Sequence, residues 1–157
     1  MALFSILTGL RRHNVTHLEW SQVNLDLSLV WLHADQTKAG KLPGVLLSPD
    51  AVALLKEQIA KHKVFVFPYR DTPMISPRRA FSEACTVAGI ENFTWRGLRH
   101  TWASWHVMRG TPHEVLRVLG GWKDLRMLMN YAHLAPSYVA GYAGNAVPWS
   151  SIQEKKG

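Results

Sequence analysis

The chain contains little cysteine and no long apolar run. A single cysteine, Cys85, excludes an internal disulfide and fits a reducing compartment such as the cytoplasm. No stretch of roughly 18 apolar residues occurs, so no membrane-spanning helix is expected. The first residues are apolar before they are charged, which is the reverse of a secretory signal peptide. We therefore expect a globular cytoplasmic protein.

Acidic side chains are also scarce. The 157 residues contain 18 Lys and Arg but only 11 Asp and Glu, which gives a formal net charge of +7. This balance favours an anionic partner, with double-stranded DNA first, although a merely soluble basic protein has the same excess. Hydrophobic residues make up 47% of the chain, too many for a disordered protein, and the length suits one domain with its own core.

Helix and strand signals predict a mainly α-helical domain with a small three-stranded antiparallel β-sheet, an α+β fold. Apolar runs at 29–32, 45–47 and 64–67 are the expected strands, and a polar turn at 35–41 joins the first two. Capping residues, prolines and glycines frame the expected helices. These helices cover residues 3–7, 11–18, 48–61, 76–89, 98–108, 111–120, 124–131 and 136–143.

Five short motifs carry the candidate chemistry. They are Thr8-Gly9-Leu10-Arg11, Thr37-Lys38, Gly97-Leu98-Arg99-His100-Thr101, Leu119-Gly120-Gly121-Trp122 and Asn130-Tyr131-Ala132-His133-Leu134. In this order, and at about this spacing, they resemble the tyrosine recombinase (phage integrase) family. The resemblance extends over most of the chain, from Leu3 to Ala143.

The resemblance implies the tyrosine recombinase catalytic-domain fold for residues 1–147, followed by a C-terminal tail at 148–157. From this resemblance we expect the family's N-terminal core-binding domain and first catalytic helix to have no counterpart in these 157 residues. The implied function is that of a site-specific recombinase, most similar to phage or prophage integrases.

A phosphodiester gains negative charge when a nucleophile attacks its phosphorus, and an arginine can hold two of its oxygens at once. The resemblance gives this role to Arg11 and Arg99. It makes Tyr131 the nucleophile, whose attack would leave a 3′-phosphotyrosine and a free 5′-hydroxyl. No other tyrosine stands in a Tyr-Ala-His-Leu context. His100 is expected to orient neighbouring groups.

Two further positions complete the implied site. Lys38 lies in the turn between the first two predicted strands, where the family places a lysine that protonates the leaving 5′-oxygen; Lys41 is the local alternative. Trp122 precedes Tyr131 by nine residues, at a position that the family fills with His or Trp. Its indole N–H can donate to a phosphate, although core packing is the alternative role.

No metal or nucleotide cofactor is implied, because the arginines supply the positive charge that Mg²⁺ supplies elsewhere. His13 and His17 have the i, i+4 spacing of a zinc-binding pair, but no nearby acid or cysteine completes such a site.

Arg96 is the sharpest departure from the family pattern. It stands three residues before Arg99, where the family usually has histidine. Histidine transfers protons near neutral pH, whereas arginine keeps its charge. We therefore expect an intact phosphate clamp with weakened proton transfer.

The family acts as a tetramer on DNA, and the predicted helix at 136–143 is the candidate contact between copies. Two alternatives stay open: a non-catalytic DNA-binding relative, and a type IB topoisomerase-like enzyme that relaxes supercoils without exchanging partners. A helix-turn-helix regulator built on 111–131 would leave the arginine and tyrosine spacing unexplained.

Overall fold

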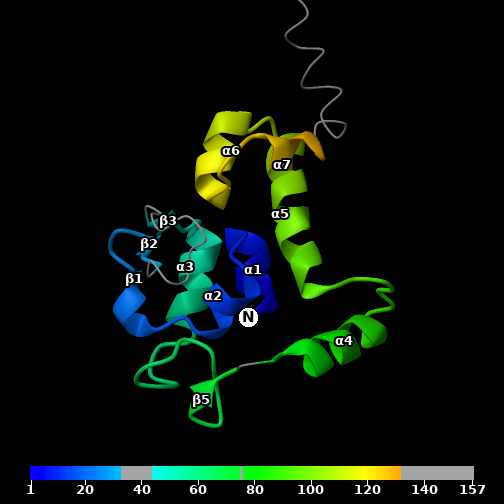
Figure 1. Cartoon of the computed structure of the whole chain (residues 1–157). Helices are drawn as coiled ribbons and strands as arrows, with labels where there is room; N and C mark the ends of the chain where they lie inside the picture. The colour runs from blue at the N-terminus through cyan, green and yellow to red at the C-terminus, as the bar shows by residue number, and fades with distance from the viewer. Residues whose placement is uncertain (33–43, 75, 132–157) are drawn as a thin grey trace, which may run out of the picture.

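The computed structural model describes residues 1–32, 44–74 and 76–131, and within these ranges the chain is mainly helical (Figure 1). The helices are α1 (Ala2–Thr8), α2 (Arg12–Thr16), α3 (Pro49–Lys56), α4 (Arg78–Val87), α5 (Trp95–Met108), α6 (His113–Gly120) and α7 (Arg126–Met129). The strands are β1 (Val23–Asn24), β2 (Leu29–Val30), β3 (Val45–Leu46), β4 (Pro68–Tyr69) and β5 (Thr72–Pro73). No helix in these ranges is both long and apolar enough to cross a membrane.

The predicted three-stranded antiparallel sheet is present, but one of its strands differs from the prediction. The order is β1-β2-β3, with Val30 paired to Val23 on one side and to Val45 on the other. The third strand is therefore Val23–Asn24, which precedes the first predicted strand, and not residues 64–67.

Residues 64–67 were predicted as a strand because all four are apolar, and that prediction is wrong. The segment lies beside residues 18–20, where the Trp20 N–H donates to the Val64 carbonyl and the Val66 N–H donates to the Leu18 carbonyl, both at 2.9 Å. Val66 and Phe67 are buried in the core. The second half of the run is apolar because it is buried, and the segment makes only an isolated bridge, between Phe65 and Glu19, rather than a strand of the sheet.

Several helix ends also differ from the prediction. α5 begins at Trp95, three residues before the predicted start, so that Arg96 belongs to its first turn. α3 begins as predicted, with the Ser48 hydroxyl accepting from the Ala51 N–H at 3.3 Å, but ends at Lys56. The predicted helix at 136–143 lies outside the described residues.

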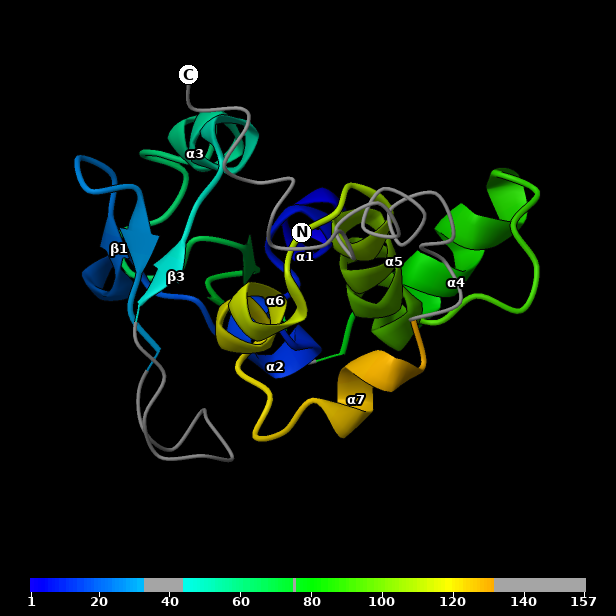
Figure 2. The same ribbon diagram turned by 90° about the horizontal axis from the view of Figure 1, so that it is seen from above.

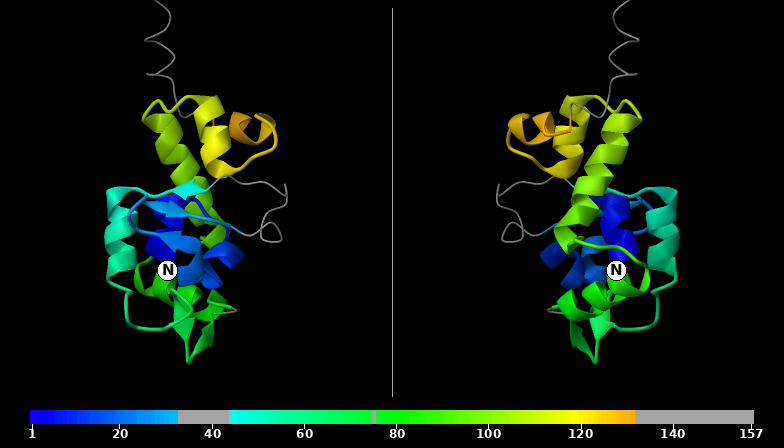
Figure 3. Two further views of the ribbon diagram at one scale, coloured as in Figure 1. Left: turned by 90° about the vertical axis from the view of Figure 1, so that its left-hand side faces the viewer. Right: turned by 90° about the vertical axis from the view of Figure 1, so that its right-hand side faces the viewer.

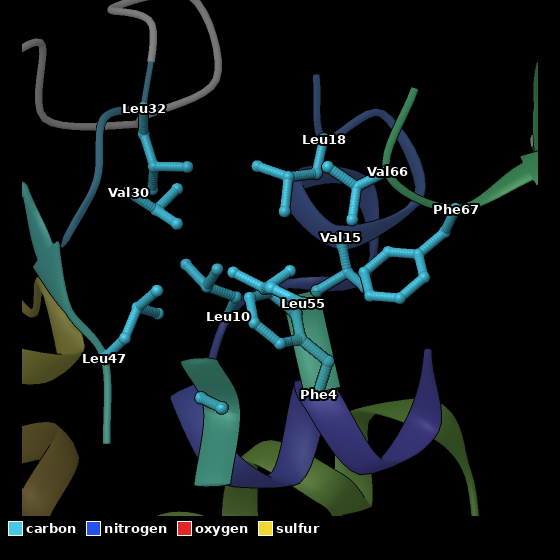
Figure 4. Packing of buried hydrophobic residues seen from close by; sticks show 11 residues of the cluster. Phe4, Leu10, Val15, Leu18, Val30, Leu32, Leu47, Leu55, Val66 and Phe67 are labelled. Carbon is cyan, nitrogen blue, oxygen red and sulfur yellow. The ribbon is translucent and has the colours of Figure 1, made fainter. Parts of the chain in front are cut away.

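Two clusters of buried side chains form the core. The first lies between α1, α2, α3 and the sheet (Figure 4). It consists of Phe4, Leu10, Val15, Leu18, Val30, Leu32, Leu47, Ala51, Leu55, Val66 and Phe67. The second joins α5 to α6 and α7, and it consists of Trp102, Ala103, Val107, Leu116, Leu128 and Tyr131.

The packing of α1 against α5 connects the two clusters. Seen from above, α1 lies between the sheet and α5, while α4 lies on the far side of α5 (Figure 2). α6 and α7 lie at one end of the molecule, and the β4–β5 hairpin lies at the other (Figure 3). The Trp95 indole N–H donates to the buried Ser5 hydroxyl at 3.1 Å and so fixes the start of α5 against α1.

Gly9 is required where α1 ends. Its backbone is left-handed, with φ +65°, and a Cβ at this position would lie 2.4 Å from the Trp102 ring. Only glycine combines this conformation with so close a ring. The contact turns the chain toward Arg11 at the start of α2.

We predict that Gly9→Ala lowers the free energy of unfolding by about 3 kcal/mol, from a strained left-handed alanine and an overpacked Trp102. Gly89→Ala is the matched control, because Gly89 has φ +67° but no atom within 4 Å of the position that a Cβ would take. It should cost only about 1 kcal/mol. Urea denaturation of both variants measures the difference, and equal losses would contradict the role given to Trp102.

Candidate active site

An open cleft of about 1600 Å³ is lined by residues of α2, α4, α5 and the segment from Gly121 to Tyr131. Five of the six predicted site residues line it, and these are Arg11, Arg96, Arg99, Trp122 and Tyr131. The structure therefore gathers four of the five sequence motifs around one cavity. The sixth residue, Lys38, lies outside the described residues, and its role stays a prediction.

The described lining of the cleft is strongly basic and contains no Asp or Glu. Its cationic residues are Arg11, Arg12, Arg78, Arg79, Arg96, Arg99 and Lys123. Such a concentration of one sign attracts an anion and strengthens its binding. The sequence motifs did not indicate Arg78, Arg79 or Lys123. The only related signal in the sequence was the positive net charge. No local motif could show that α4 lines the cleft, because α4 reaches it through tertiary packing.

Arg99 connects three of the motifs. Its Nη1 donates to the Gly9 carbonyl at 2.7 Å, its Nη2 donates to the Gly120 carbonyl, and its guanidinium carbon lies 4.5 Å from the centre of the Trp122 ring. Burial lowers the pKa of Arg99 to about 10; Arg11 acts in the same direction and Tyr131 opposes it. The guanidinium thus stays charged at neutral pH and is held in one orientation.

Arg11 lies at the entrance to α2, in extended backbone with φ −66° and ψ 151°. Its charge acts on Arg99, so the two cations are close in the cleft although 88 residues separate them in sequence. Within the described ranges, neither arginine forms an ion pair with a carboxylate. Both side chains therefore contribute positive charge to the same cleft.

Trp122 both packs in the core and lines the cleft. Its ring lies over Gly120, where a Cβ would be 2.1 Å away, and 5.9 Å from the Trp102 ring. Gly121 ends α6 in left-handed backbone, with φ 59°, and turns the chain so that the indole faces Arg99. Trp122 therefore packs beside the core and also lines the cleft, while donation of its indole N–H to a phosphate stays a prediction.

Tyr131 follows the short helix α7, and the Asp124 carboxylate accepts from the N–H of its first residue, Arg126, at 2.7 Å. The ring belongs to the second core cluster and is 7% exposed. The phenol hydroxyl forms a hydrogen bond with Nδ1 of His100. Burial raises the pKa of Tyr131, whereas Arg99 and Arg96 act to lower it.

Arg96 lies in the first turn of α5 and lines the same cleft, where its side chain is exposed. No hydrogen bond ties its side chain to any other residue in the described part of the chain. Its charge reaches both His100 and Tyr131, and it acts to lower the pKa of each. Arg96 therefore acts electrostatically on both His100 and Tyr131.

The His13 and His17 rings pack together with their centres 4.1 Å apart. The His17 Nδ1 atom is hydrogen-bonded with the Thr16 hydroxyl at 2.8 Å, so one ring nitrogen is already occupied. Across residues 1–32, 44–74 and 76–131, no three His, Cys, Asp or Glu side chains gather in a way that could hold a metal ion.

Comparison with known proteins gives consistent matches. The sequence matches the phage integrase family over residues 1–137. It is 37% identical to the integrase of Salmonella phage P22 over an alignment covering 98% of this chain and 45% of that protein.

Solved structures with the same fold include the catalytic domain of bacteriophage HP1 integrase, with TM-score 0.70, 26% identity, and coverage of 95% of this chain and 81% of that one. A second is the Tn1549 transposon integrase in complex with transposon right end DNA, with TM-score 0.76, 14% identity, and coverage of 92% and 57%. The chain spans about half the length of the P22 relative.

We predict that Arg99→Lys lowers the free energy of unfolding by about 1–3 kcal/mol, because lysine keeps the charge but cannot bridge two carbonyls and stack on Trp122. Arg96→Lys is the matched control, on the same helix but exposed, and should change stability by less than about 0.5 kcal/mol. Thermal and urea unfolding measure both variants. A stable Arg99→Lys protein would show that the two carbonyl contacts contribute little.

Proposed function

The chain belongs to the phage integrase family, and we propose that it is the catalytic domain of a site-specific recombinase that cuts and rejoins duplex DNA through Tyr131. One observation carries the proposal: a single basic cleft brings together Arg11, Arg99, Trp122 and Tyr131 from four separate motifs. The solved DNA complexes of the Tn1549 integrase, which has the same fold, support a duplex as the ligand.

In the proposed reaction the scissile phosphate binds between Arg11 and Arg99. The Gly9 and Gly120 carbonyls fix the Arg99 guanidinium before DNA arrives, so no reorganisation is needed as charge develops on the phosphate. Two of the five N–H groups of Arg99 are used in these contacts, which leaves the others for phosphate oxygens. The Trp122 indole N–H is the third candidate donor.

The Tyr131 phenol oxygen attacks phosphorus, an O–P bond forms to the 3′-phosphate, and the bond to the 5′-oxygen breaks. Lys38 is the proposed donor of the proton that the leaving 5′-oxygen requires. The phosphotyrosine bond keeps the energy of the broken phosphodiester, so a second 5′-hydroxyl can be joined without ATP. The proposal requires no metal ion or nucleotide cofactor.

Arg78 and Arg79 of α4 and Lys123 extend the basic lining beyond the reacting centre. We propose that they bind phosphates flanking the scissile one, since phosphate contacts position a duplex without reading its sequence. Self-association as a tetramer on DNA, through the segment at 136–143, stays a prediction because that segment lies outside the described residues.

Two other functions remain as alternatives. A DNA-binding relative without catalysis would bind duplex DNA regardless of the Tyr131 hydroxyl. A topoisomerase-like enzyme would form the same adduct but relax a supercoiled plasmid without recombinant products. Assays of adduct formation, relaxation and recombination on the same DNA separate these two functions from a recombinase.

The first test is covalent trapping on a library of randomised nicked duplexes, in which loss of the cut fragment prevents religation. The wild-type chain should form an SDS-resistant adduct, and Tyr131→Phe should abolish it while keeping the buried ring. Tyr69→Phe is the control, since Tyr69 is 49% exposed and lies outside the cleft. Absence of an adduct from wild type, or its persistence in Tyr131→Phe, would contradict the proposal.

Replacement of the usual histidine by Arg96 should slow cleavage without abolishing DNA binding. We predict that Arg96→His accelerates adduct formation at least about tenfold at neutral pH, because a positioned proton-transfer group contributes roughly 10²–10⁴-fold. Arg96→Lys, which keeps the charge without this ability, should give no acceleration. Single-turnover rates measure the effect, and an unchanged rate in Arg96→His would refute the hypothesis.

A further inference from the structure

The hydroxyl of the proposed nucleophile, Tyr131, forms a hydrogen bond with the side chain of His100. His100 lies on α5 directly after Arg99, and its ring centre is 5.8 Å from that of Tyr131. Nδ1 of His100 is hydrogen-bonded with the Tyr131 hydroxyl, and both residues line the cleft. The contact joins the third sequence motif to the fifth at the atom that would attack phosphorus.

The pKa values of His100 and Tyr131 determine which of the two groups carries the proton between them. Burial, Arg96 and Arg99 all lower the pKa of His100, so its ring is neutral at pH 7 and has one nitrogen able to accept a proton. Burial raises the pKa of Tyr131, so its phenol keeps its proton and is a poor nucleophile until that proton is removed. In the tautomer that carries the ring proton on Nε2, Nδ1 accepts from the phenol hydroxyl, and this is the tautomer that a base would require.

We infer that His100 is the general base for Tyr131, and that its Nδ1 removes the phenol proton as the phenol oxygen attacks the scissile phosphate. This inference rests on the proposed function. In this proposal His100 takes the proton from Tyr131. Arg96 cannot do so, because arginine keeps its charge.

The step balances without any co-reactant. The phenol O–H bond breaks and its proton moves to Nδ1, while the phenol oxygen forms the bond to phosphorus. The 5′-oxygen departs with the electron pair of its bond to phosphorus and is protonated by Lys38 or by water. In rejoining, the imidazolium of His100 returns its proton to the phenol oxygen as that oxygen leaves.

DNA itself should increase the basicity of His100. Within the described part of the chain, the charged groups that act on the His100 ring are Arg96 and Arg99, on the same helix, and Tyr131 faces it from the segment after α7. A bound phosphate places negative charge beside both arginines and offsets their repulsion of an imidazolium. Proton removal then becomes favourable when a phosphate occupies the cleft, which protects the free enzyme from unproductive ionisation.

A purely orienting role for His100 makes a different prediction from a base. Asparagine places an amide near the position of Nδ1 and can keep a hydrogen bond to the phenol, but it cannot take up a proton. If His100 only orients Tyr131, His100→Asn should therefore keep most of the wild-type cleavage rate. If His100 is the base, His100→Asn should lose that rate. His100→Ala removes both functions.

The test uses the full 157-residue chain and the best nicked duplex recovered from the trapping library. The readout is the single-turnover rate of adduct formation at saturating DNA between about pH 5 and 9, the range in which histidine titrates. Both His100→Asn and His100→Ala should lose at least about 100-fold in rate. The wild-type rate should fall at acidic pH, where His100 is protonated, and this inflection should be absent in His100→Asn. DNA affinity should be unchanged.

His106→Asn is the matched control. His106 lies on the same helix but outside the cleft, and asparagine can keep its hydrogen bond to the Thr111 hydroxyl, which is 3.0 Å long. This variant should cleave at the wild-type rate. Thermal melts of all three variants exclude unfolding as the cause of a lost rate.

A duplex with a 5′-bridging sulfur separates the nucleophile from the leaving group, because a thiolate leaves without a proton. The defect of His100→Asn should persist on this DNA if His100 acts on Tyr131. Recovery of the rate on the sulfur substrate, or a rate for His100→Asn within about threefold of wild type on ordinary DNA, would overturn the inference while leaving the proposed function intact. No adduct from wild type would overturn both.

Discussion

The hydrogen bonds from the Arg99 guanidinium to the carbonyls of Gly9 and Gly120 are the interaction on which the site depends. They join the end of α1, the middle of α5 and the end of α6, so one side chain connects the two halves of the core. Both carbonyls belong to glycines against which a tryptophan ring packs, and neither position has space for a Cβ. The two glycines therefore let the tryptophan rings pack directly on the backbone whose carbonyls hold the cation.

The same arrangement leaves a half-buried cation without a carboxylate partner among the described residues. Backbone carbonyls and the Trp122 face compensate only part of the lost hydration, and the pKa of Arg99 is lowered to about 10 as a result. The pKa of His100 is lowered for related reasons, by burial and by two neighbouring arginines. Both shifts describe a cleft that disfavours further positive charge until an anion enters it. A phosphate would relieve both at once, which links the electrostatics of the site to the ligand in the proposed function.

The sequence predicted the helical framework well where capping signals are strong. Ser48 and Pro49 begin α3 as their local chemistry indicates, whereas α7 begins after Leu125 rather than Asp124, although the Asp124 carboxylate accepts from the Arg126 N–H. The third strand was placed wrongly because Val66 and Phe67 are apolar as members of the core, and a short apolar run does not distinguish a partly buried loop from a strand. The start of α5 was placed too late because Gly97 weakens the helical pattern. In the structure Gly97 lies within the helix, and the Phe93 ring packs against it where a Cβ would stand.

The sequence by itself determined the order and spacing of five motifs that resemble the recombinase family, because residue type and spacing are properties of the chain itself. That resemblance identified Arg11, Arg99, Trp122 and Tyr131 as candidates for phosphate chemistry before any coordinates. The tertiary structure decided what those side chains meet: the neighbours of Arg99 come from 90 and 21 residues away, and His100 meets Tyr131 from 31 residues away. The basic wall formed by Arg78 and Arg79 likewise exists only because α4 lies along the cleft. Such contacts depend on how helices pack against each other, and no short sequence motif encodes that packing.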